Sequence, residues 1–544
     1  MDNQKALEQT IRSYIPFLTP AALCDRNARR FPEKEALVDA RERLNWRQVQ
    51  VLSDKLAAAL VEMGLSRSRP LLVQLPNCVE LFLARLACEK AGVACVTVSP
   101  FFKARELAQI LKHTKPAAAM VFRTYRSLEF LSAIQRADEE SKLEFFIAGD
   151  DVPKGTISLQ EVFERETTPA PPADMLKGRS FTPLDSCQIA TTSGSSGVPK
   201  CVEVSIYSRL LTSSIHVKRF KLGHVDTIAP FGPIISGTSE ALGYFGTSLL
   251  GSRVILIDQF DPEAVLHRIA EEGVTFACLV PTMMAKIANA ASQIRRAEKL
   301  KGIVTYGSLL PIPVAEKMER LLGVKIVQAY GTMDFGGISA TFADDNLDVR
   351  LGTVGRPLDG NDVIVCGDHD EPVARGEEGH IRVRGIHAVG KYYNAPELDG
   401  EKWKDGYFDV GEIGRFDQDG NLILLGRSDN VIIRGGQNIY PEDIETLLVR
   451  HPNIQEAAVI GIPDPVYGQR VCAFVAAKPG REISSNEALG FLKESGVASF
   501  KIPEMIEVLP DLPRVPSGEK VNRRDLVRIA QDIHRAISSS PGEE

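Results

Sequence analysis

The sequence predicts an α/β protein, with a large N-terminal domain of layered α/β sheets, a β-rich subdomain and a small α+β C-terminal domain. The chain has 544 residues, which exceeds the size of one ordinary domain. Strand-length apolar runs alternate with helical patterns up to about residue 331, which indicates layered sheets. From about residue 347 the runs become short and are separated by turn residues, as in β structure. We expect an N-terminal domain at residues 1–427, its β-rich subdomain at about 347–427, and a C-terminal domain at 428–544.

The first part of the chain alternates helices with strands. In the clearest helical pattern, apolar residues recur at three- and four-residue spacing from Val49 to Met63, and Gly64 ends the helix. Parallel sheets built this way bind ligands in the crevice at the carboxyl ends of their strands. We expect helices at residues 21–30, 45–63, 79–91 and 104–113, and strands at residues 35–39, 71–75, 94–98 and 117–121.

The alternation resumes after residues 150–182, a polar and proline-bearing stretch that we interpret as a surface excursion. Helices are expected at residues 208–220, 238–249, 262–272 and 314–322, and strands at residues 227–230, 254–257, 275–280, 303–308 and 326–331. The short runs of the β-rich part lie at residues 362–366, 380–384 and 422–425. Mixed helices and strands of the last unit are expected at residues 441–449, 454–461, 471–477, 485–496 and 522–537.

Composition and charge narrow the class of protein. The chain is 44% hydrophobic and 25% charged, as in soluble globular proteins, and its net charge of −7 gives no basic field for nucleic acid. The nine cysteines contain no CxxC pair, which favours buried free thiols in a reducing compartment over disulfides or zinc. The N-terminus is polar, and no apolar run has the length of a membrane span. We therefore predict a cytoplasmic protein with no signal peptide, no membrane span and no nucleic-acid partner.

A run of small residues from Thr191 to Gly197, followed by Pro199 and Lys200, is the clearest chemical signal. Apolar residues precede it and an alternating run follows it, which predicts strand, loop and strand. Glycines and hydroxyls let several backbone N–H groups point at one phosphate, and Lys200 would add a positive charge. The alternative is a flexible Ser/Gly surface linker. The spacing does not fit a Walker A loop.

Further glycine-anchored turns follow in a fixed order. They lie at residues 306–308, 328–332, 407–412, 426–429, 435–439 and 513–520. Each is weak alone, but together with the Ser/Gly loop the sequence resembles the adenylate-forming superfamily. This superfamily contains acyl-CoA synthetases, stand-alone aryl-acid ligases, peptide-synthetase adenylation domains and luciferases. The resemblance extends from about residue 20 to residue 530.

The resemblance implies a reaction in two steps. A carboxylate attacks the α-phosphate of MgATP to give an acyl-adenylate and pyrophosphate, and a thiol then takes the acyl group. The implied cofactors are ATP, Mg²⁺ and coenzyme A, or phosphopantetheine on a carrier protein. Catalytic Lys200 and the loop would hold the β- and γ-phosphates. The loop residues concerned are Thr192, Ser193, Gly194, Ser195, Ser196 and Gly197.

Two positions of this loop depart from the family pattern. Ser196 stands where threonine is customary, which is a mild change. Cys201 stands where a glycine is expected after the lysine, so we expect a remodelled turn at this point.

The resemblance assigns two turns to the adenine base. Gly307 and Ser308 would form one of them, and Tyr330 in the other would stack on the base; the alternative for Tyr330 is a core tyrosine. The second turn consists of Gln328, Ala329, Tyr330, Gly331 and Thr332.

Two acidic positions depart in opposite senses. Asp334 stands where the family has a glutamate that helps hold Mg²⁺, and a bridging water would cover the missing methylene. Glu412 stands where the family has an aspartate that accepts hydrogen bonds from the ribose hydroxyls. Met333 lacks the hydroxyl that is usual at its position, and Thr332 would supply it if the backbone rotates. A weakened nucleotide site is the alternative that these changes leave open.

The resemblance also assigns roles near the domain boundary. Arg427 matches a residue that contacts the ribose and the phosphates. Asp429 matches the hinge about which the family rotates its C-terminal domain between the two half-reactions, so this domain is expected to be mobile. Gly435 and Gly436 would line the tunnel for the thiol arm; the alternative is a plain turn.

A lysine near the C-terminus completes the implied machinery. Lys520 matches the catalytic lysine that bridges the substrate carboxylate and the α-phosphate, where its charge stabilises the transition state. The family pattern is Gly-Lys, whereas here Glu519 separates Gly518 from Lys520, which we interpret as one extra loop residue. The alternative is a surface lysine in a charged run.

The acyl pocket is expected around two segments of the chain. The family often has a histidine after an aromatic residue, and here Gly232, or Ile234 when counted back from Gly237, replaces it. Small residues suggest room for a ring or a branched acid, and Phe335 would close the floor. Residues 229–237 contain no Arg or Lys, so no second carboxylate is indicated. Ordinary core packing is the alternative for the whole set, which is Phe231, Gly232, Ile234, Ile235, Gly237, Phe335 and Gly336.

The sequence therefore predicts an ATP-dependent ligase of a small carboxylic acid and a thiol, an acyl- or aryl-CoA synthetase. One alternative is a stand-alone adenylating enzyme that loads the phosphopantetheine of a carrier protein. Another is a non-catalytic family member that acts as a binding protein. Acyl transfer to free coenzyme A or to a carrier protein separates the first two, and carboxylate-dependent pyrophosphate exchange separates both from the third.

Overall fold

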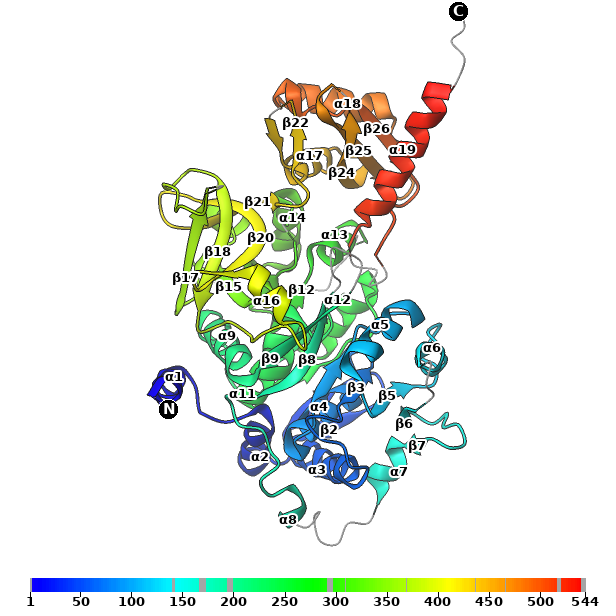
Figure 1. The fold of residues 1–544 in the computed structure, drawn as a ribbon, viewed down its shortest axis with the longest axis vertical. Helices are drawn as coiled ribbons and strands as arrows, with labels where there is room; N and C mark the ends of the chain where they lie inside the picture. Colours follow the sequence, from blue (N-terminus) through cyan, green and yellow to red (C-terminus); the bar gives the residue numbers. More distant parts are fainter. Residues whose placement is uncertain are drawn as a thin grey trace, which may run out of the picture. The chain divides into compact units, whose positions relative to one another are not determined.

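The structure is a computed structural model that describes residues 2–138, 142–165, 173–192, 199–290, 297–308, 310–367, 369–435, 437–464, 466–515 and 520–539. The chain divides into two units, Met1–Val363 with Val383–Phe408 and Ile364–Arg382 with Asp409–Glu544 (Figure 1). Strands β17 (Asn361–Cys366), β18 (Gly379–Gly385) and β20 (Tyr407–Phe416) pass from one unit into the other. The domain boundary expected at residue 427 stays a prediction.

A seven-stranded sheet of the first unit has the order β7-β6-β5-β3-β4-β8-β9. All neighbours in it are parallel except β8 and β9, which form an antiparallel hairpin. Its strands are β3 (Leu71–Gln74), β4 (Cys95–Thr97), β5 (Ala118–Phe122), β6 (Glu144–Ala148), β7 (Ile157–Ser158), β8 (Ser186–Thr192) and β9 (Lys200–Ser205). The helices of this part are α1 (Asp2–Tyr14), α2 (Pro20–Arg30), α3 (Trp46–Glu62), α4 (Val79–Ala91), α5 (Ala104–Thr114), α6 (Phe130–Ala137), α7 (Leu159–Glu164) and α8 (Ala173–Leu176).

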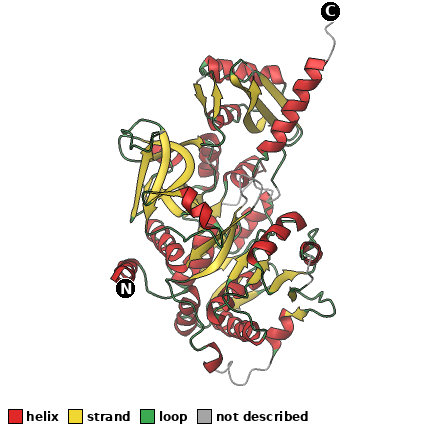
Figure 2. Ribbon diagram, viewed as in Figure 1, coloured by secondary structure: helices red, strands yellow, loops and turns green. Residues whose placement is uncertain are grey.

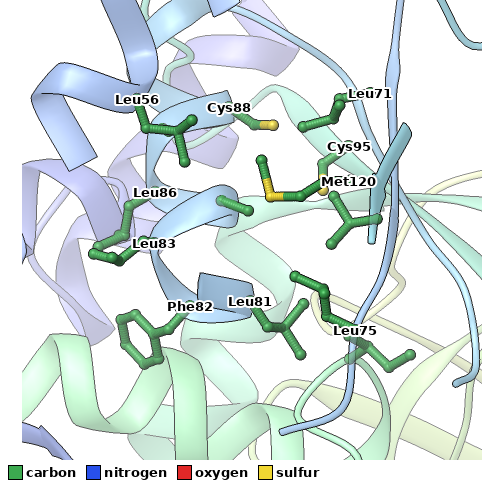
Figure 3. Packing of buried hydrophobic residues seen from close by; sticks show 14 of the residues in the cluster. Leu56, Leu71, Leu75, Leu81, Phe82, Leu83, Leu86, Cys88, Cys95 and Met120 are labelled. Atoms are coloured by element: carbon green, nitrogen blue, oxygen red, sulfur yellow. The ribbon is translucent and has the colours of Figure 1, made fainter. Parts of the chain in front are cut away.

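Helix α4 forms the centre of the core around this sheet. Every residue of the helix is buried, and its apolar side chains meet Leu71, Cys95 and Met120 of the sheet and Leu56 of α3 (Figure 3). Apolar residues on every side of the helix place it in this interior, although four charged residues lie among them. Charged residues on it therefore have to be paired, and this requirement becomes important at the site.

A nine-stranded sheet completes the first unit, with the order β16-β15-β14-β13-β12-β10-β11-β1-β2. Strands β11, β10, β12, β13 and β14 run parallel, so their carboxyl ends share one edge. The strands are β1 (Glu35–Val38), β2 (Arg43–Asn45), β10 (Thr227–Pro230), β11 (Arg253–Ile255), β12 (Phe276–Leu279), β13 (Gly302–Thr305), β14 (Lys325–Thr332), β15 (Gly336–Ala340) and β16 (Arg356–Pro357). The accompanying helices are α9 (Ile206–Arg219), α10 (Gly237–Glu240), α11 (Thr247–Leu250), α12 (Pro262–Glu271), α13 (Pro281–Ala290), α14 (Ile312–Leu322), α15 (Leu347–Gly352) and α16 (Pro396–Lys402).

The second unit contains a sheet of order β23-β22-β25-β24 in which β26 also pairs with β25. Apolar residues of these strands and of α17 and α18 form its core. Its further elements are β21 (Leu422–Arg427), β22 (Ile432–Arg434), β23 (Gln437–Ile439), α17 (Pro441–Leu448), β24 (Ile454–Asp464), β25 (Gly468–Ala477), α18 (Ser485–Glu494), the 3₁₀-helix η2 (Ser499–Lys501), β26 (Met505–Leu509) and α19 (Arg523–Ser539). Strand β19 (Trp403–Lys404), which belongs to the first unit, pairs with the start of β20.

The predicted fold class is confirmed, since helices and strands alternate through the first unit and a smaller mixed unit contains the C-terminal part (Figure 2). Two details differ from the prediction. Residues 150–182, expected as an excursion, contain β7, α7 and α8. The helix expected at residues 238–249 contains the π-helical segment η1 (Ala241–Gly246), where a side chain at Gly243 would press on Pro230 and Ile234. The close approach of the chain to β10 at this point is a property that periodicity does not encode.

Candidate active site

The hairpin of β8 and β9 supports the Ser/Gly loop. Thr191 pairs with Cys201 and Thr192 with Lys200, so the two expected strands are observed. The loop residues Ser193, Gly194, Ser195, Ser196 and Gly197 lie outside the described residues.

Cys201 continues strand β9 and is buried, with its carbonyl accepting a hydrogen bond from the N–H of Tyr393 at 2.9 Å. The turn that we expected to be remodelled at Cys201 is therefore a paired strand. Burial raises the pKa of this thiol to about 12. Cys201 is a core side chain that stays protonated, and it offers no nucleophile.

Residues 328–332, expected as the second adenine turn, form the carboxyl end of strand β14, so the prediction of a turn at these residues is wrong. The side-chain amide of Gln328 faces the backbone carbonyls of Arg350, Leu351 and Thr353 at 3.1–3.2 Å, so it stabilises the turn after α15. Ala329 and Tyr330 are both 8% exposed. A side chain at Gly331 would overlap the carbonyl of Gly336, so only glycine fits there.

Thr332 ends the strand and closes the following turn. Its Oγ1 accepts a hydrogen bond from the N–H of Phe335 at 3.1 Å. The hydroxyl is thus used as an acceptor in the turn that contains Asp334, and its alternative role at the nucleotide stays a prediction.

Asp334, Tyr392 and Lys200 form a polar chain next to this turn. The hydroxyl of Tyr392 donates to Oδ2 of Asp334 at 2.6 Å, and Nζ of Lys200 lies 5.4 Å from the centroid of the Tyr392 ring. Burial and the Asp334 carboxylate raise the pKa of Tyr392, so the phenol keeps its proton and donates. The sequence had suggested Lys200 and Asp334 but no role for Tyr392, which lies in a segment with no glycine-anchored motif.

The first adenine turn brings an unexpected side chain into the acyl region. Gly307 and Ser308 follow β13 and are exposed, with Gly307 at φ +90°. The ring of Tyr306, just before them, lies against Gly232 and Gly237. The room that we expected over these two glycines is therefore filled, and that expectation is wrong at this point.

Side chains from α4 and from the turn before it hold the segment that follows β10. The side-chain amide of Asn77 donates to the carbonyl of Gly232 and accepts from the N–H of Ile234, both at 2.9 Å. Arg85 of α4 donates to the carbonyl of Ile234 at 2.8 Å. Such contacts from distant parts of the chain have no local signature in the sequence.

The remaining acyl-pocket residues are mostly core side chains. Phe231 is 5%, Ile234 0% and Ile235 7% exposed, and all three belong to the hydrophobic clusters of the first unit. The buried ring of Phe335 meets the rings of Trp403 and Phe408, with centroids 6.3 and 5.8 Å away. Gly336 begins β15. Their contacts with an acid stay predictions.

A fully buried ion network lies behind this segment. Glu240 is completely inaccessible and contacts Arg85 at 2.8 Å and Arg209 at 3.4 Å. Arg209 also reaches the carbonyl of Met333 at 3.5 Å, beside Asp334. Burial lowers the pKa of Arg209, and the Glu240 charge opposes this effect. The network links the acyl segment to the turn that contains Asp334. In the sequence, only the charged residues within the otherwise apolar pattern of α4 indicated such a network.

In the second unit the structure brings three predicted residues together. Glu412 of β20 lies opposite Arg427 of β21. The guanidinium of Arg427 donates to both carboxylate oxygens of Asp429, at 2.8 and 3.0 Å. Arg427, the predicted contact to ribose and phosphates, therefore forms an ion pair with Asp429, the predicted hinge residue.

The thiol tunnel and the lysine are also located in this unit. Gly435 has φ +57° and donates its N–H to the carbonyl of Tyr467 at 2.8 Å, while Gly436 lies outside the described residues. Lys520 is exposed, and its carbonyl accepts from the N–H of Val515 at 2.9 Å. The preceding residues 516–519 lie outside the described residues.

Two features are absent from the described residues. No cluster of three or more His, Cys, Asp or Glu side chains in the described ranges could hold a metal ion. No helix within them is long and apolar enough to cross a membrane.

Comparisons with known proteins identify the family. The chain is 29% identical over 530 residues to the salicylyl-CoA synthase / salicylate adenylyltransferase of a Streptomyces species, covering 94% of each chain. It is 26% identical over 512 residues to the 2,3-dihydroxybenzoate-AMP ligase of Bacillus subtilis, covering 93% of this chain and 92% of that one. The crystal structure of an anthranilate CoA ligase with anthranoyl-AMP superposes with a TM-score of 0.85 at 23% identity, covering 96% of this chain and 99% of the other.

The profile of the AMP-binding enzyme family matches residues 24–393, and that of the AMP-binding enzyme C-terminal domain matches residues 443–519. The chain therefore belongs to the family of AMP-binding, adenylate-forming enzymes.

Proposed function

We propose that this protein activates a carboxylic acid with ATP, releases pyrophosphate and transfers the acyl group to the thiol of coenzyme A. Membership of the family supports the adenylation step. The observation that supports it most directly is the chain of Lys200, Tyr392 and Asp334 at the end of β14. A positive charge and an oriented carboxylate lie there beside the hairpin that supports the Ser/Gly loop.

The donor set fits Mg²⁺ held mainly by phosphates and water. Within the described ranges the chain offers no three-ligand cluster, and Asp334 presents a single oriented carboxylate. Hard oxygen ligands and several retained waters are what Mg²⁺ prefers. When bound, the ion neutralises phosphate charge and so assists attack on the α-phosphate. Tyr392 fixes which oxygen of Asp334 remains available.

The other residues take the roles that the family implies. The Ser/Gly loop and Lys200 hold the pyrophosphate end of ATP, and Tyr330 stacks on the adenine. Glu412 and Arg427 bind the ribose and phosphates, and Lys520 stabilises the charge that develops during attack. These positions, including Asp429 as the hinge, are proposals.

Product analysis tests the function. Incubation with the acid, ATP, Mg²⁺ and coenzyme A is expected to give AMP, pyrophosphate and the acyl-CoA thioester. Formation of ADP and phosphate in place of AMP and pyrophosphate contradicts the proposal. The names of the relatives make salicylate, 2,3-dihydroxybenzoate and anthranilate the first acids to try.

A second candidate is loading of a carrier-protein thiol. A relative at 28% identity is the salicyl-AMP ligase / salicyl-S-ArCP synthetase of Mycobacterium tuberculosis, so the family contains enzymes of this kind. Acyl transfer to a phosphopantetheinylated carrier but not to free coenzyme A would favour this candidate. A protein that forms no adenylate with any acid would instead be a binding protein.

Replacement of Lys520 tests the placement of the catalytic lysine. We expect Lys520→Ala to lower the rate of adenylate formation by about 10²–10³-fold, since it removes a charge aimed at the transition state. ATP binding, followed by fluorescence or calorimetry, should change little. The exposed Lys493 in α18 provides the matched control, Lys493→Ala. Full activity of Lys520→Ala would refute the assignment.

A further inference from the structure

Tyr306 occupies the space that two glycines leave open in the acyl region. A Cβ built on Gly232 would overlap the hydroxyl of Tyr306 and lie 3.1 Å from Oγ of Ser239. A Cβ built on Gly237 would lie 3.2 Å from the Tyr306 ring. The tyrosine and Gly232 are therefore complementary in shape, and a larger residue at 232 excludes the ring as it stands.

The position of this ring in the sheet is the one where ligands bind. Tyr306 follows β13, and Gly232 follows β10 on the far side of β12. Tyr330 stands at the end of β14, the neighbour of β13 on the other side. The side chain of Tyr306 thus crosses the carboxyl end of β12 between the nucleotide turn and the acyl segment.

The ring is held in place by contacts of its own. The hydroxyls of Tyr306 and Ser239 form a hydrogen bond of 2.6 Å, and Ser239 is fully buried. The next residue, Glu240, is fixed by the buried guanidinium groups of Arg85 and Arg209. Because its anchor is part of the buried ion network, the ring is a rigid wall.

We propose that Tyr306 is a specificity-determining residue that shortens the acyl pocket, so that the protein takes a compact acid such as a single-ring or short branched one. This inference rests on the proposed function. The position of Tyr306 also explains the glycine at residue 232. Its backbone φ is not positive, so other residues could adopt this conformation, but a side chain there would overlap the tyrosine. The positive φ of +58° at Gly237, in contrast, restricts that position by itself.

The test compares acids of increasing size in wild type and in Tyr306→Ala. Pyrophosphate exchange is measured with straight-chain acids of increasing length and with one-ring and two-ring aromatic acids. We expect the ratio of kcat/KM for the larger acid to that for the compact acid to rise at least about tenfold in Tyr306→Ala, since one methylene in a pocket is worth this much. The KM for ATP should stay near that of wild type.

Two further variants distinguish a size limit from a general loss of structure. Tyr306→Phe keeps the ring and loses the bond to Ser239, so it should keep the preference for compact acids. In the double variant Gly232→Ala with Tyr306→Ala, the new methyl group should reverse part of the gain for larger acids. If Tyr306→Ala does not fold, Tyr306→Leu replaces it as the smaller side chain.

Failure of this inference and failure of the proposed function give different results. An unchanged acid ratio in a folded Tyr306→Ala that is active with compact acids overturns the inference. No exchange by wild type with any acid overturns the proposed function. In that case the size limit is tested by the shift in melting temperature with ATP and each acid. Stabilisation of Tyr306→Ala, but not of wild type, by larger acids supports the limit. Equal shifts in the two proteins overturn it.

Discussion

The nucleotide side and the acyl side of the candidate site are built in different ways. The described residues of the nucleotide side lie on the hairpin of β8 and β9 and in the turn after β14, where neighbours in sequence contact one another. The acyl side consists of one segment after β10 that is held by side chains from α4, α9 and the turn after β13. ATP is common to the reactions of the whole family, whereas the acid differs from one enzyme to another. Local contacts on the nucleotide side and contacts from distant segments on the acyl side match this difference.

The largest expected effect is the loss of stability when the buried carboxylate of the acyl side, Glu240, is removed. Glu240→Ala leaves Arg85 and Arg209 in the interior without their carboxylate, which costs about 3–5 kcal/mol of unfolding free energy. Urea denaturation measures it. The exposed pair of Arg123 and Asp151 serves as the control, because Asp151→Ala should cost less than about 1 kcal/mol. Equal costs for the two variants would contradict the role of burial.

A smaller effect is expected on the nucleotide side. Tyr392→Phe removes the hydrogen bond that orients Asp334, so the apparent affinity for Mg²⁺ should fall about 10-fold. The Mg²⁺ dependence of pyrophosphate exchange and of the thermal shift by ATP both report it. Tyr393→Phe, next in the chain, is the matched control, and an equal response of the two variants would show that Tyr392 does not position the carboxylate.

The smallest effect is a contrast in pH dependence between two buried groups of the first unit. Burial lowers the pKa of His387 from its ordinary 6.5 to about 4. The unfolded chain then binds more protons in this window, so this residue makes the protein less stable as pH falls. Burial raises the pKa of Glu89 of α4, which accepts hydrogen bonds from the N–H of Ala21 and the hydroxyl of Tyr244, from 4.5 to about 7. The folded protein binds more protons there, so this residue makes the protein more stable as pH falls.

Two variants separate these opposing contributions. Urea midpoints measured from pH 7 down to about pH 4 should fall more steeply in Glu89→Gln than in wild type, and less steeply in His387→Gln. The exposed His267 provides the control His267→Gln, which should follow wild type. Slopes that change in the same direction for Glu89→Gln and His387→Gln would contradict the assignment.

The same contrast explains what could be predicted from the sequence. The alternation of helices and strands follows from apolar periodicity, and the bend at residues 306–308 follows from its glycine, because both are local properties of the chain. Residues 328–332, expected as a turn, instead end strand β14. The wall formed by Tyr306 was not predicted, although its motif was identified. Its partners Gly232 and Ser239 come from other parts of the chain, and only the pairing order of β10, β12 and β13 brings them together.

Substitutions at the acidic positions illustrate the same limit. Asp334 was identified as a shortened carboxylate, but local sequence could not show that Tyr392 orients it. Likewise, the glycine expected at Cys201 indicated a turn, whereas pairing with Thr191 makes this residue part of a strand. In both cases a contact with another segment of the chain decides what the motif had left open.

We infer that the nucleotide side is functional despite its substitutions and that the acyl side selects the acid. Carboxylate-dependent exchange of labelled pyrophosphate into ATP by the full chain tests it most directly. We predict exchange that requires Mg²⁺ and a compact acid and that falls sharply as the acid becomes larger. A folded protein that binds ATP and yet exchanges pyrophosphate with no acid in the panel would contradict the account.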